Sequence, residues 1–300
     1  MPSTKRHARR IDGELLLDKP PGIGSNAALQ HARRLFAAER AGHTGTLDPM
    51  ASGLLAVCFG EATKFAGELL DAGKRYVATL RLGERTSSGD AEGDVLERRP
   101  VSVTPEQLCA VLERFRGEIL QVPPMYSALK REGRPLYEYA RKGIEVEREA
   151  RAVTVTALSL DRYEGVEATV SVQCSKGTYV RTLAEDIGEA LGCGAHLCKL
   201  VRTGIGRFRL EQALRFEDIE ALPEGERPGL LLPVDALVLD LPEIALQEPL
   251  EAAFRQGQAV SVPGGMQGRV RAYAAGGRFL GVGLADPVGS LRPKRLLSSG

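Results

Sequence analysis

The feature that most constrains the fold is a run of alternating apolar and polar residues, VEATVSVQCSKG, at residues 166–177. Apolar side chains occupy the even positions from Val166 to Cys174, and polar side chains occupy the odd positions between them. Successive side chains of a strand point to opposite faces, so the run predicts a strand with one face in a core and the other near solvent. Half-buried strands of this kind are typical of antiparallel sheets.

Periodicity elsewhere predicts a mixture of strands and helices. We expect strands over residues 14–20, 54–60 and 75–83, and helices over residues 25–36, 61–73, 104–119 and 179–191. Ser25 is expected to cap the first helix, and residues 84–94 are expected to form a loop. This mixture favours an α+β fold.

Two segments differ from the rest of the chain in composition and periodicity. Residues 121–151 contain adjacent prolines, many charges and little periodicity, which indicates an exposed arm. The arm has a net charge of +3 over residues 130–142, enough to hold a nucleic-acid stem, although such a pattern is more often only a solvated face. Over residues 241–300, short alternating stretches separated by glycines predict a small β-barrel module.

Charge is distributed unevenly, although the whole chain has a net charge of only +1. The net charge is −9 over residues 211–251, +6 over residues 252–300, and +4 over residues 1–210. This segregation lets a nearly neutral protein present basic surfaces to a phosphate backbone. An acidic linker beside an incidentally basic tail would explain the same charges.

Composition narrows the class of protein. The chain is 43% apolar and 26% charged, as in an ordinary soluble globular protein, and no run of 18 apolar residues indicates a transmembrane helix. The basic residues 1–10 are followed by no apolar segment, so we expect a loose tail there and no signal peptide. Five scattered cysteines favour reduced thiols and a cytoplasmic location.

One stretch holds a single carboxylate among small and apolar residues. It is GHTGTLDPMASGLLAV at residues 42–57, in which Asp48 is the acid and His43 the only neighbouring base. A structural interpretation is available, because Asp is a favoured N-cap and Pro49 suits the first residue of a helix. The alternative is a catalytic carboxylate.

Other chemical motifs are incomplete. Cys193, His196 and Cys198 lie close together, but structural zinc sites usually need a second ligand pair, so we expect no metal. The stretch GIGSN at residues 22–26 completes neither a nucleophile elbow nor a phosphate-binding loop. We therefore expect no nucleotide and no other cofactor.

With four further stretches and a closing element, the Asp48 stretch resembles the bacterial TruB family of tRNA pseudouridine synthases. The resemblance runs in order over residues 12–210 and is most specific in GHTGTLDP and in KGTYVRTL at residues 176–183. It implies a pseudouridine synthase domain over residues 11–240, in which helices flank a mixed, mainly antiparallel sheet, with an RNA-binding arm at about 121–151. From the position of residues 241–300, it implies a PUA-like RNA-binding domain there.

The family pattern implies a role for each matching residue. Asp48 matches the nucleophilic carboxylate, and Arg181 matches the arginine that pairs with it. Tyr76 matches the tyrosine that stacks on the target uracil, and Tyr179 and Leu200 match residues that line the base pocket. His43 matches a residue that meets the RNA near the flipped nucleotides, and Lys19 matches a residue of the framework. Taken without the resemblance, Arg181 could form a surface pair with Glu185, and the two tyrosines could pack at a sheet edge.

The resemblance also implies a reaction, the conversion of the T-loop uridine at tRNA position 55 to pseudouridine without guide RNA. We expect the protein to be a monomer. The reaction breaks the bond from uracil N1 to ribose C1′ and joins C5 to C1′, so it is redox-neutral, and a carboxylate can serve as its nucleophile. Two alternatives stay open: a dyskerin-type enzyme that depends on guide RNA, and an RNA-binding or tRNA-folding protein with secondary catalysis. The sequence departs from the family in VRTGIGRF at residues 201–208, where a second arginine and GPF are usual, and in the loop at 84–94.

Overall fold

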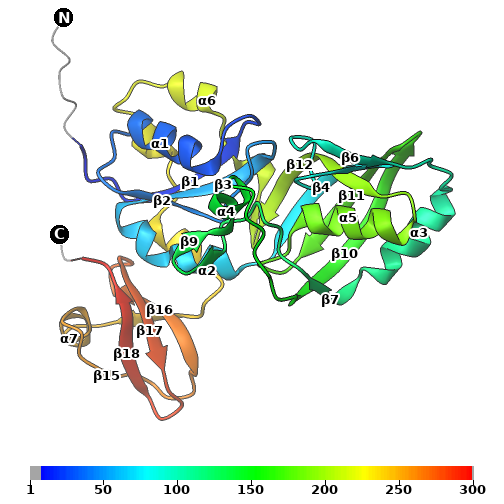
Figure 1. Cartoon of the computed structure of the whole chain (residues 1–300). Coiled ribbons are helices and arrows are strands. Elements are labelled where there is room, and N and C mark those ends of the chain that lie inside the picture. The colour runs from blue at the N-terminus through cyan, green and yellow to red at the C-terminus, as the bar shows by residue number, and fades with distance from the viewer. Residues whose placement is uncertain (1–7, 299–300) are drawn as a thin grey trace, which may run out of the picture.

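The structure is a computed structural model that describes residues 8–298. Most of the basic tail expected at residues 1–10 lies outside the described residues. A long twisted sheet with helices on its faces forms the main body, and a smaller curled sheet follows near the C-terminal end (Figure 1). The predicted α+β class, with a mixed and mainly antiparallel sheet, is confirmed.

The main sheet has nine strands, and its path runs β1-β3-β12-β4-β11-β10-β7, with β2 paired to β3 and β13 paired to β12. The contact of β3 with β12 is parallel, and the other pairs are antiparallel. The strands are β1 (Gly13–Lys19), β2 (Ala41–Thr44), β3 (Ser52–Phe59), β4 (Lys74–Leu82), β7 (Gly117–Gln121), β10 (Arg151–Glu164), β11 (Glu167–Cys174), β12 (Ala195–Ile205) and β13 (Phe208–Arg209).

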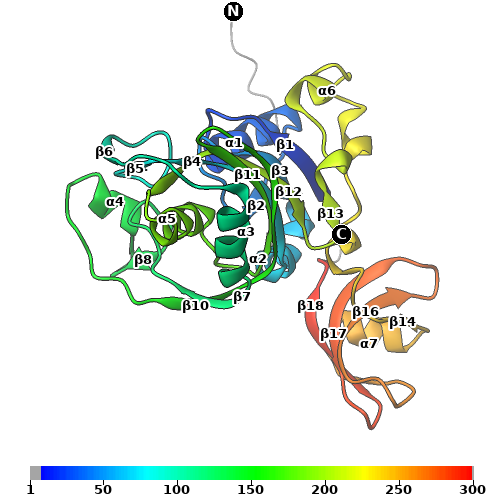
Figure 2. The same cartoon turned by 90° about the vertical axis from the view of Figure 1, so that its right-hand side faces the viewer.

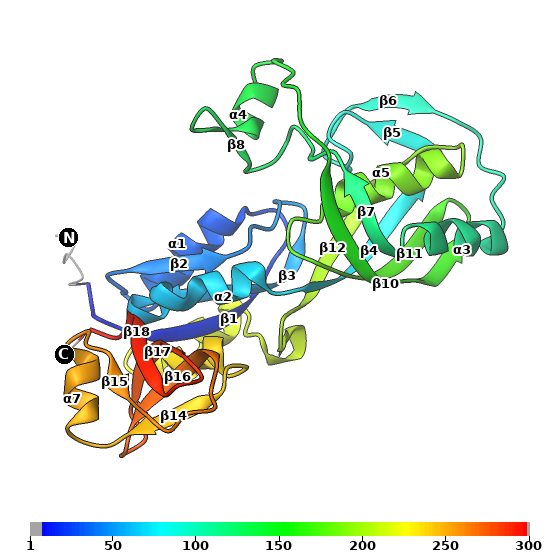
Figure 3. The same ribbon diagram turned by 90° about the horizontal axis from the view of Figure 1, so that it is seen from below.

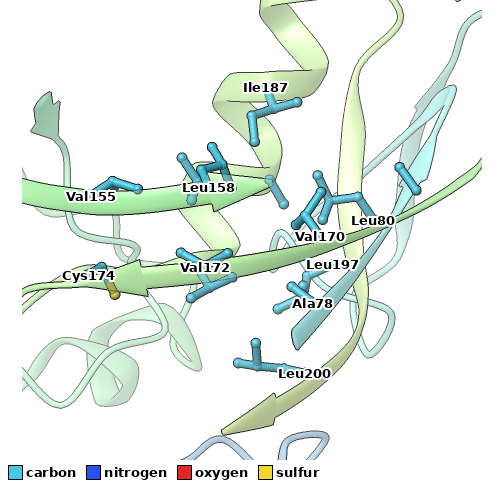
Figure 4. Close-up of a cluster of buried hydrophobic side chains, with 14 of the residues drawn as sticks. Ala78, Leu80, Val155, Leu158, Val170, Val172, Cys174, Ile187, Leu197 and Leu200 are labelled. Carbon is cyan, nitrogen blue, oxygen red and sulfur yellow. The ribbon is translucent and has the colours of Figure 1, made fainter. Parts of the chain in front are cut away.

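The alternating run forms β11, as predicted. Its apolar side chains from Ala168 to Cys174 are buried, and the side chains between them are half-buried or exposed. They meet Leu158 from β10 and Ile187 from a helix in one core cluster, which lies between the sheet and that helix (Figure 4). The helix is α5 (Val180–Ala190), and its position over this face places its first turn near the middle of the sheet.

Helices cover both faces of the sheet. α5 and α3 (Pro105–Arg114) pack on the half formed by β4, β10 and β11. At the other end, α1 (Ser25–Leu35) and α6 (Phe216–Glu220) cover one face of β1 and β3. The opposite face of these strands is covered by the 3₁₀ segments η1 (Gly60–Phe65) and η4 (Val234–Val238) and by α2 (Ala66–Asp71).

Smaller elements lie in the connections. They are β5 (Glu84–Thr86), β6 (Val95–Arg98), β8 (Lys130–Arg131), β9 (Arg134–Pro135), α4 (Leu136–Ala140), η2 (Leu210–Gln212) and η3 (Arg227–Leu230). The β8–β9 hairpin and α4 form a segment that projects from the main body (Figure 3). In the described part of the chain, no helix has the length and apolar character needed to cross a membrane.

Four local predictions were wrong in detail. The helix expected over 104–119 ends at Arg114, because Gly117 has a φ of +89° and begins β7. Ser25 does not cap α1, since the cap residue is Gly24 and the Ser25 hydroxyl bonds with Leu47. The helix expected over 61–73 is divided into η1 and α2, and the loop expected over 84–94 begins with the strand β5.

The C-terminal sheet has five strands in the order β14-β16-β17-β18-β15, so β14 and β15 are its edges and it curls without closing. Its elements are β14 (Glu243–Leu246), α7 (Leu250–Arg255), β15 (Val260–Ser261), β16 (Gly268–Ala274), β17 (Phe279–Ala285) and β18 (Ser290–Leu296). Val282 and Phe279 of β17 pack into the core beside η1 and α2. Figure 2 shows this sheet and the projecting segment with α4 on opposite sides of the main sheet.

Candidate active site

Asp48 lies in the loop between β2 and β3, where β3 begins to pair with β12. The residues that follow it form a strand, so the interpretation of Asp48 as a helix cap is wrong. The loop is fixed from the turn after β1. The Ser25 hydroxyl donates to the Leu47 carbonyl at 2.9 Å and accepts from the Leu47 N–H at 2.7 Å, and the Gly22 N–H donates to the Pro49 carbonyl at 2.8 Å.

The buried guanidinium of Arg181 faces Asp48. Arg181 belongs to the first turn of α5, and its side chain is 5% exposed. Its Nε lies 3.1 Å from Asp48 Oδ2, and its Nη1 lies 3.5 Å from Asp90 Oδ2. Two backbone carbonyls, of Ser88 and Tyr126, accept its other hydrogen bonds. The guanidinium points inward, so the surface pair with Glu185 is not formed.

Asp90 is a member of this ion-pair network that the sequence did not reveal. It is buried, and its Oδ1 accepts hydrogen bonds from the Ser88 hydroxyl and from the Glu92 N–H. Backbone hydrogen bonds of Gly89 and Ala91 with Leu197 tie the loop to β12. The Ser-Gly-Asp sequence could have indicated a turn, but no local pattern predicts a contact with a residue 91 positions later.

A cavity of about 290 Å³ opens beside Asp48. The predicted site residues that line it come from four elements: Asp48 from its loop, Tyr76 from β4, Tyr179 and Arg181 from the start of α5, and Leu200 from β12. A second cavity of about 440 Å³ also contacts Asp48 and Arg181 and extends to the projecting segment, where Tyr137 and Arg141 line it. Residues far apart in the sequence therefore surround one carboxylate.

Each tyrosine is held by the framework around it. β4 lies between β11 and β12, so Tyr76 is not at a sheet edge. Tyr179 is the residue before α5, and the Gln121 side-chain amide bonds its backbone on both sides, accepting from the N–H at 3.0 Å and donating to the carbonyl at 3.3 Å. The backbones that carry the two tyrosines are thereby fixed at the cavity.

Lys19 and His43 lie near the site but do not line either cavity. Lys19 is fully buried, and its Nζ donates to the carbonyls of Pro20 and Ile23 at 2.9 and 2.6 Å, which closes the turn after β1. Burial lowers the Lys19 pKa to about 8. His43 is half-buried in β2, and burial together with Arg202 lowers its pKa. Its Nδ1 has no hydrogen-bond partner among the described residues.

The Asp48 carboxylate has a raised pKa. Burial is the largest cause, Arg181 and Lys19 oppose it, and the nearby Asp90 adds to it. The side chain is still 37% exposed, because it faces the cavity. A carboxylate that is partly desolvated and oriented by a guanidinium is a stronger base and nucleophile than one in water.

The cysteines considered for a metal site lie away from this cavity. Cys193 packs in a small apolar cluster, and Cys198 Sγ lies 3.6 Å from His196 Nε2. Over residues 8–298, no group of three or more His, Cys, Asp or Glu side chains has an arrangement suited to a metal ion.

Three family models match consecutive segments of the chain. "TruB family pseudouridylate synthase (N terminal domain)" matches residues 33–180, "tRNA pseudouridylate synthase B C-terminal domain" residues 181–239, and "Pseudouridine synthase II TruB, C-terminal" residues 242–297. The chain is also 59% identical over 291 residues to tRNA pseudouridine synthase B of Azoarcus sp. (strain BH72), covering 97% of this chain and 96% of that protein. It is 55% identical over 293 residues to the protein of the same name in Dechloromonas aromatica (strain RCB), covering 98% of each.

Two solved structures share the fold. A chain from an H/ACA RNP bound to a substrate RNA containing 2′-deoxyuridine superposes with a TM-score of 0.72 at 26% identity, covering 96% of this chain and 85% of that one. A chain from a Cbf5-Nop10-Gar1 complex gives a TM-score of 0.71 at 28% identity, covering 98% and 85%.

Proposed function

Because the chain belongs to the TruB family of pseudouridine synthases, we propose that it converts the T-loop uridine at position 55 of tRNA to pseudouridine, without a guide RNA. Its relatives are named as pseudouridine synthases, and pseudouridine is an isomer of uridine, so the enzyme is an isomerase. One observation carries the finer proposal: Asp48 lies 3.1 Å from the buried Arg181, at the wall of a cavity that two tyrosines line.

The cavity suits a base that has left its stack. Unstacking costs a few kcal/mol, which aromatic contacts and contacts to the RNA backbone offset. Tyr76 supplies the stacking face, and Tyr179 and Leu200 supply the walls of the pocket. A base that fills the pocket displaces water from the charged groups, which then interact more strongly than they would in solvent.

Asp48 acts as the nucleophile, and Arg181 orients it. Asp48 forms a covalent bond to the substrate as the N1–C1′ bond breaks, and the base then turns within the pocket. The bond to Asp48 breaks again as C5 bonds to C1′. The C5 proton leaves and N1 gains one, so the product is an isomer of the substrate and no redox partner is needed. Nothing in these steps requires a metal ion or an organic cofactor.

Basic residues outside the pocket bind the rest of the RNA. The arm at about 121–151 presents Lys130, Arg131, Arg134, Arg141 and Lys142, and β18 presents the exposed Arg292, Lys294 and Arg295. We assign residues 11–240 to catalysis and 241–300 to a PUA-like RNA-binding domain, with the separate five-stranded sheet in support. We expect a cytoplasmic monomer, which fits the five free cysteines.

A guide-dependent enzyme is the second candidate, because solved structures of similar fold include chains from multi-component complexes, one of them an H/ACA RNP. Sequence identity favours the first candidate. This chain is 26–28% identical to the chains from those complexes, and 55–59% identical to proteins named tRNA pseudouridine synthase B.

The test uses purified protein, a synthetic T-arm stem-loop and no other RNA, with pseudouridine mapped by position. We expect modification of the T-loop uridine at a rate within about tenfold, or ~1.4 kcal/mol, of that for whole tRNA, because a loop presents bases that can be splayed and stacked. Modification that appears only after a guide RNA or partner protein is added would establish the second candidate. No modification of either RNA would reject both parts of the proposal.

A further inference from the structure

We propose that Arg202 is a positioning residue that holds the Asp48 loop and Tyr76 at a fixed separation across the cavity. Arg202 belongs to the stretch VRTGIGRF, to which the sequence assigned no role. The inference rests on the proposed function, because it concerns the geometry of the same site.

Arg202 occupies the centre of the main sheet. In β12 it lies opposite Tyr76 of β4 on one side and beside Gly53 of β3 on the other. Arg202 is 1% exposed, and its side chain is one of the largest fully buried ones among the described residues. Arg202 is also one of the residues that line the cavity beside Asp48. It therefore lies between the strand that carries the stacking tyrosine and the loop that carries the nucleophile.

The guanidinium interacts with both parts of the site. Its Nε donates to the Leu54 carbonyl of β3 at 2.7 Å, and its Nη2 donates to the Gly45 carbonyl at 3.0 Å. It also interacts with the Tyr76 side chain, since Arg202 opposes the rise in the Tyr76 pKa that burial causes. Gly45 lies three residues before Asp48 and has a φ of +74°, and a Cβ there would lie 3.5 Å from Arg202 Nη1. The planar group thus packs directly on the loop.

A purely structural role explains this arrangement poorly. None of these three partners is a carboxylate, and a buried cation with neutral partners is an expensive way to join strands. A rigid planar fork, in contrast, fixes the relative positions of the acceptors it bridges, which a flexible ammonium does not. Misplacement of reacting groups by about 1 Å costs on the order of 100-fold in rate.

Arg227 provides a matched control. It too donates to backbone carbonyls, with Nε to Ile219 and Leu222 at 3.1 Å and Nη1 to Leu35 at 2.8 Å. These partners lie around α1 and α6, and Arg227 lines neither cavity at Asp48. Replacing Arg227 therefore measures how much the loss of such hydrogen bonds destabilises the protein when the active site is not involved.

The experiment compares Arg202→Met, Arg202→Lys and Arg227→Met. Single-turnover rates on the T-arm hairpin and on tRNA are measured at saturating protein, below each melting temperature, with the Kd measured separately. We expect Arg202→Met to lower the rate about 100-fold and to change the Kd less than about threefold. The rate of Arg202→Lys should exceed that of Arg202→Met by less than about tenfold, because a positive charge without the planar guanidinium is insufficient. Arg227→Met should lower the melting temperature and leave the rate unchanged.

Tyr76→Phe completes a double-mutant cycle with Arg202→Lys, which also serves if Arg202→Met does not fold. The inference is supported if the double variant loses less rate than the product of the fold-losses of the two single variants, since both changes break one linkage. Multiplicative effects would overturn it, as would a folded Arg202→Met that turns over within about threefold of the parent. Full recovery in Arg202→Lys would also overturn it, because charge alone would then suffice. A parent protein that modifies neither RNA would overturn the proposed function and this inference with it.

Discussion

At Asp48, burial and a neighbouring cation act in opposite directions on one carboxylate. Burial favours the protonated form, and Arg181 favours the ionised form. Asp90 lies on the far side of the same guanidinium, 3.5 Å from Nη1, and holds it in place. The local sequence already indicated that Asp48 is unusual, as the single acid of its stretch. Asp90 could not be predicted, because only the folded chain brings it to Arg181.

Arg181→Lys should lower the single-turnover rate on tRNA more than it lowers tRNA affinity. A lysine keeps the charge but cannot reach Asp48, Asp90 and the two carbonyls with one planar group. Rates at saturating protein and a separate binding titration distinguish the two effects. Equal losses in rate and affinity would show that Arg181 acts in binding.

The rate of pseudouridine formation should fall on the acid side with an apparent pKa above the usual aspartate value of 3.8, because the Asp48 pKa is raised. The ionised form is the nucleophile, so activity is present above that pKa and lost as the pH falls through it. Single-turnover rates as a function of pH give the position of this limb. A limb at or below 3.8 would contradict the assignment of burial as the dominant effect.

Glu14→Gln should stabilise the protein more at high pH than at low pH. Glu14 of β1 is fully buried, neither carboxylate oxygen has a hydrogen-bond partner among the described residues, and burial raises its pKa from 4.5 to about 8. The folded state keeps the proton, so the contribution of Glu14 to stability is complete below pH 4.5 and is lost as the pH rises through 8. The check is the melting temperature of parent and variant, measured below and above this pH range. A difference between the two proteins that does not change with pH would contradict the prediction.

At the scale of the element, α5 and β11 do most to place the site. Both follow from the sequence: strict alternation predicts β11, and the stripe of Val180, Leu183, Ala184 and Ile187 predicts α5. The arrangement of these elements does not follow, because the parallel contact of β3 with β12 joins residues about 150 positions apart. That contact brings the Asp48 loop and Leu200 to one cavity.

Gly188→Ala should destabilise the protein and lower the rate, although alanine is the better helix former. A Cβ at Gly188 would lie 2.1 Å from the Ala195 nitrogen and 2.4 Å from the Gly194 carbonyl carbon, so α5 would have to move away from β12 and take Arg181 with it. Gly67→Ala is the control, since nothing lies within 4 Å of its added Cβ in α2. It should be neutral or stabilising by about 0.5–1 kcal/mol. Similar melting temperatures for the two variants would contradict the close packing of α5.

At the scale of the whole molecule, the C-terminal sheet packs firmly on the part of the chain that forms the main sheet. The Phe65 and Phe279 rings lie 5.5 Å apart, Val282 is buried in the shared core, and Arg269 pairs with Glu68 of α2. The sequence indicated a separate basic module but not this contact, since a pattern of short strands and glycines does not show what a module packs against. The module and the projecting arm lie on opposite sides of the main sheet, so RNA that meets both must extend past the active site (Figure 2).

Replacing Arg292, Lys294 and Arg295 with Gln should weaken tRNA binding and reduce its salt dependence. All three are exposed on β18, and none forms an ion pair with another described residue. Each lost phosphate contact should reduce the slope of log K against log salt by about 0.7–0.9, and the single-turnover rate at saturation should not change. An unchanged slope would show that β18 does not contact the RNA.

Asp48→Asn tests the assignment of the nucleophile most directly. The variant keeps the shape of the side chain and removes the carboxylate. Parent and variant are incubated with unmodified tRNA and no other RNA, pseudouridine is mapped by position, and tRNA binding is measured in parallel. We predict pseudouridine at position 55 with the parent, none with the variant, and similar binding by both. Turnover by Asp48→Asn within tenfold of the parent would contradict the role of Asp48 as nucleophile.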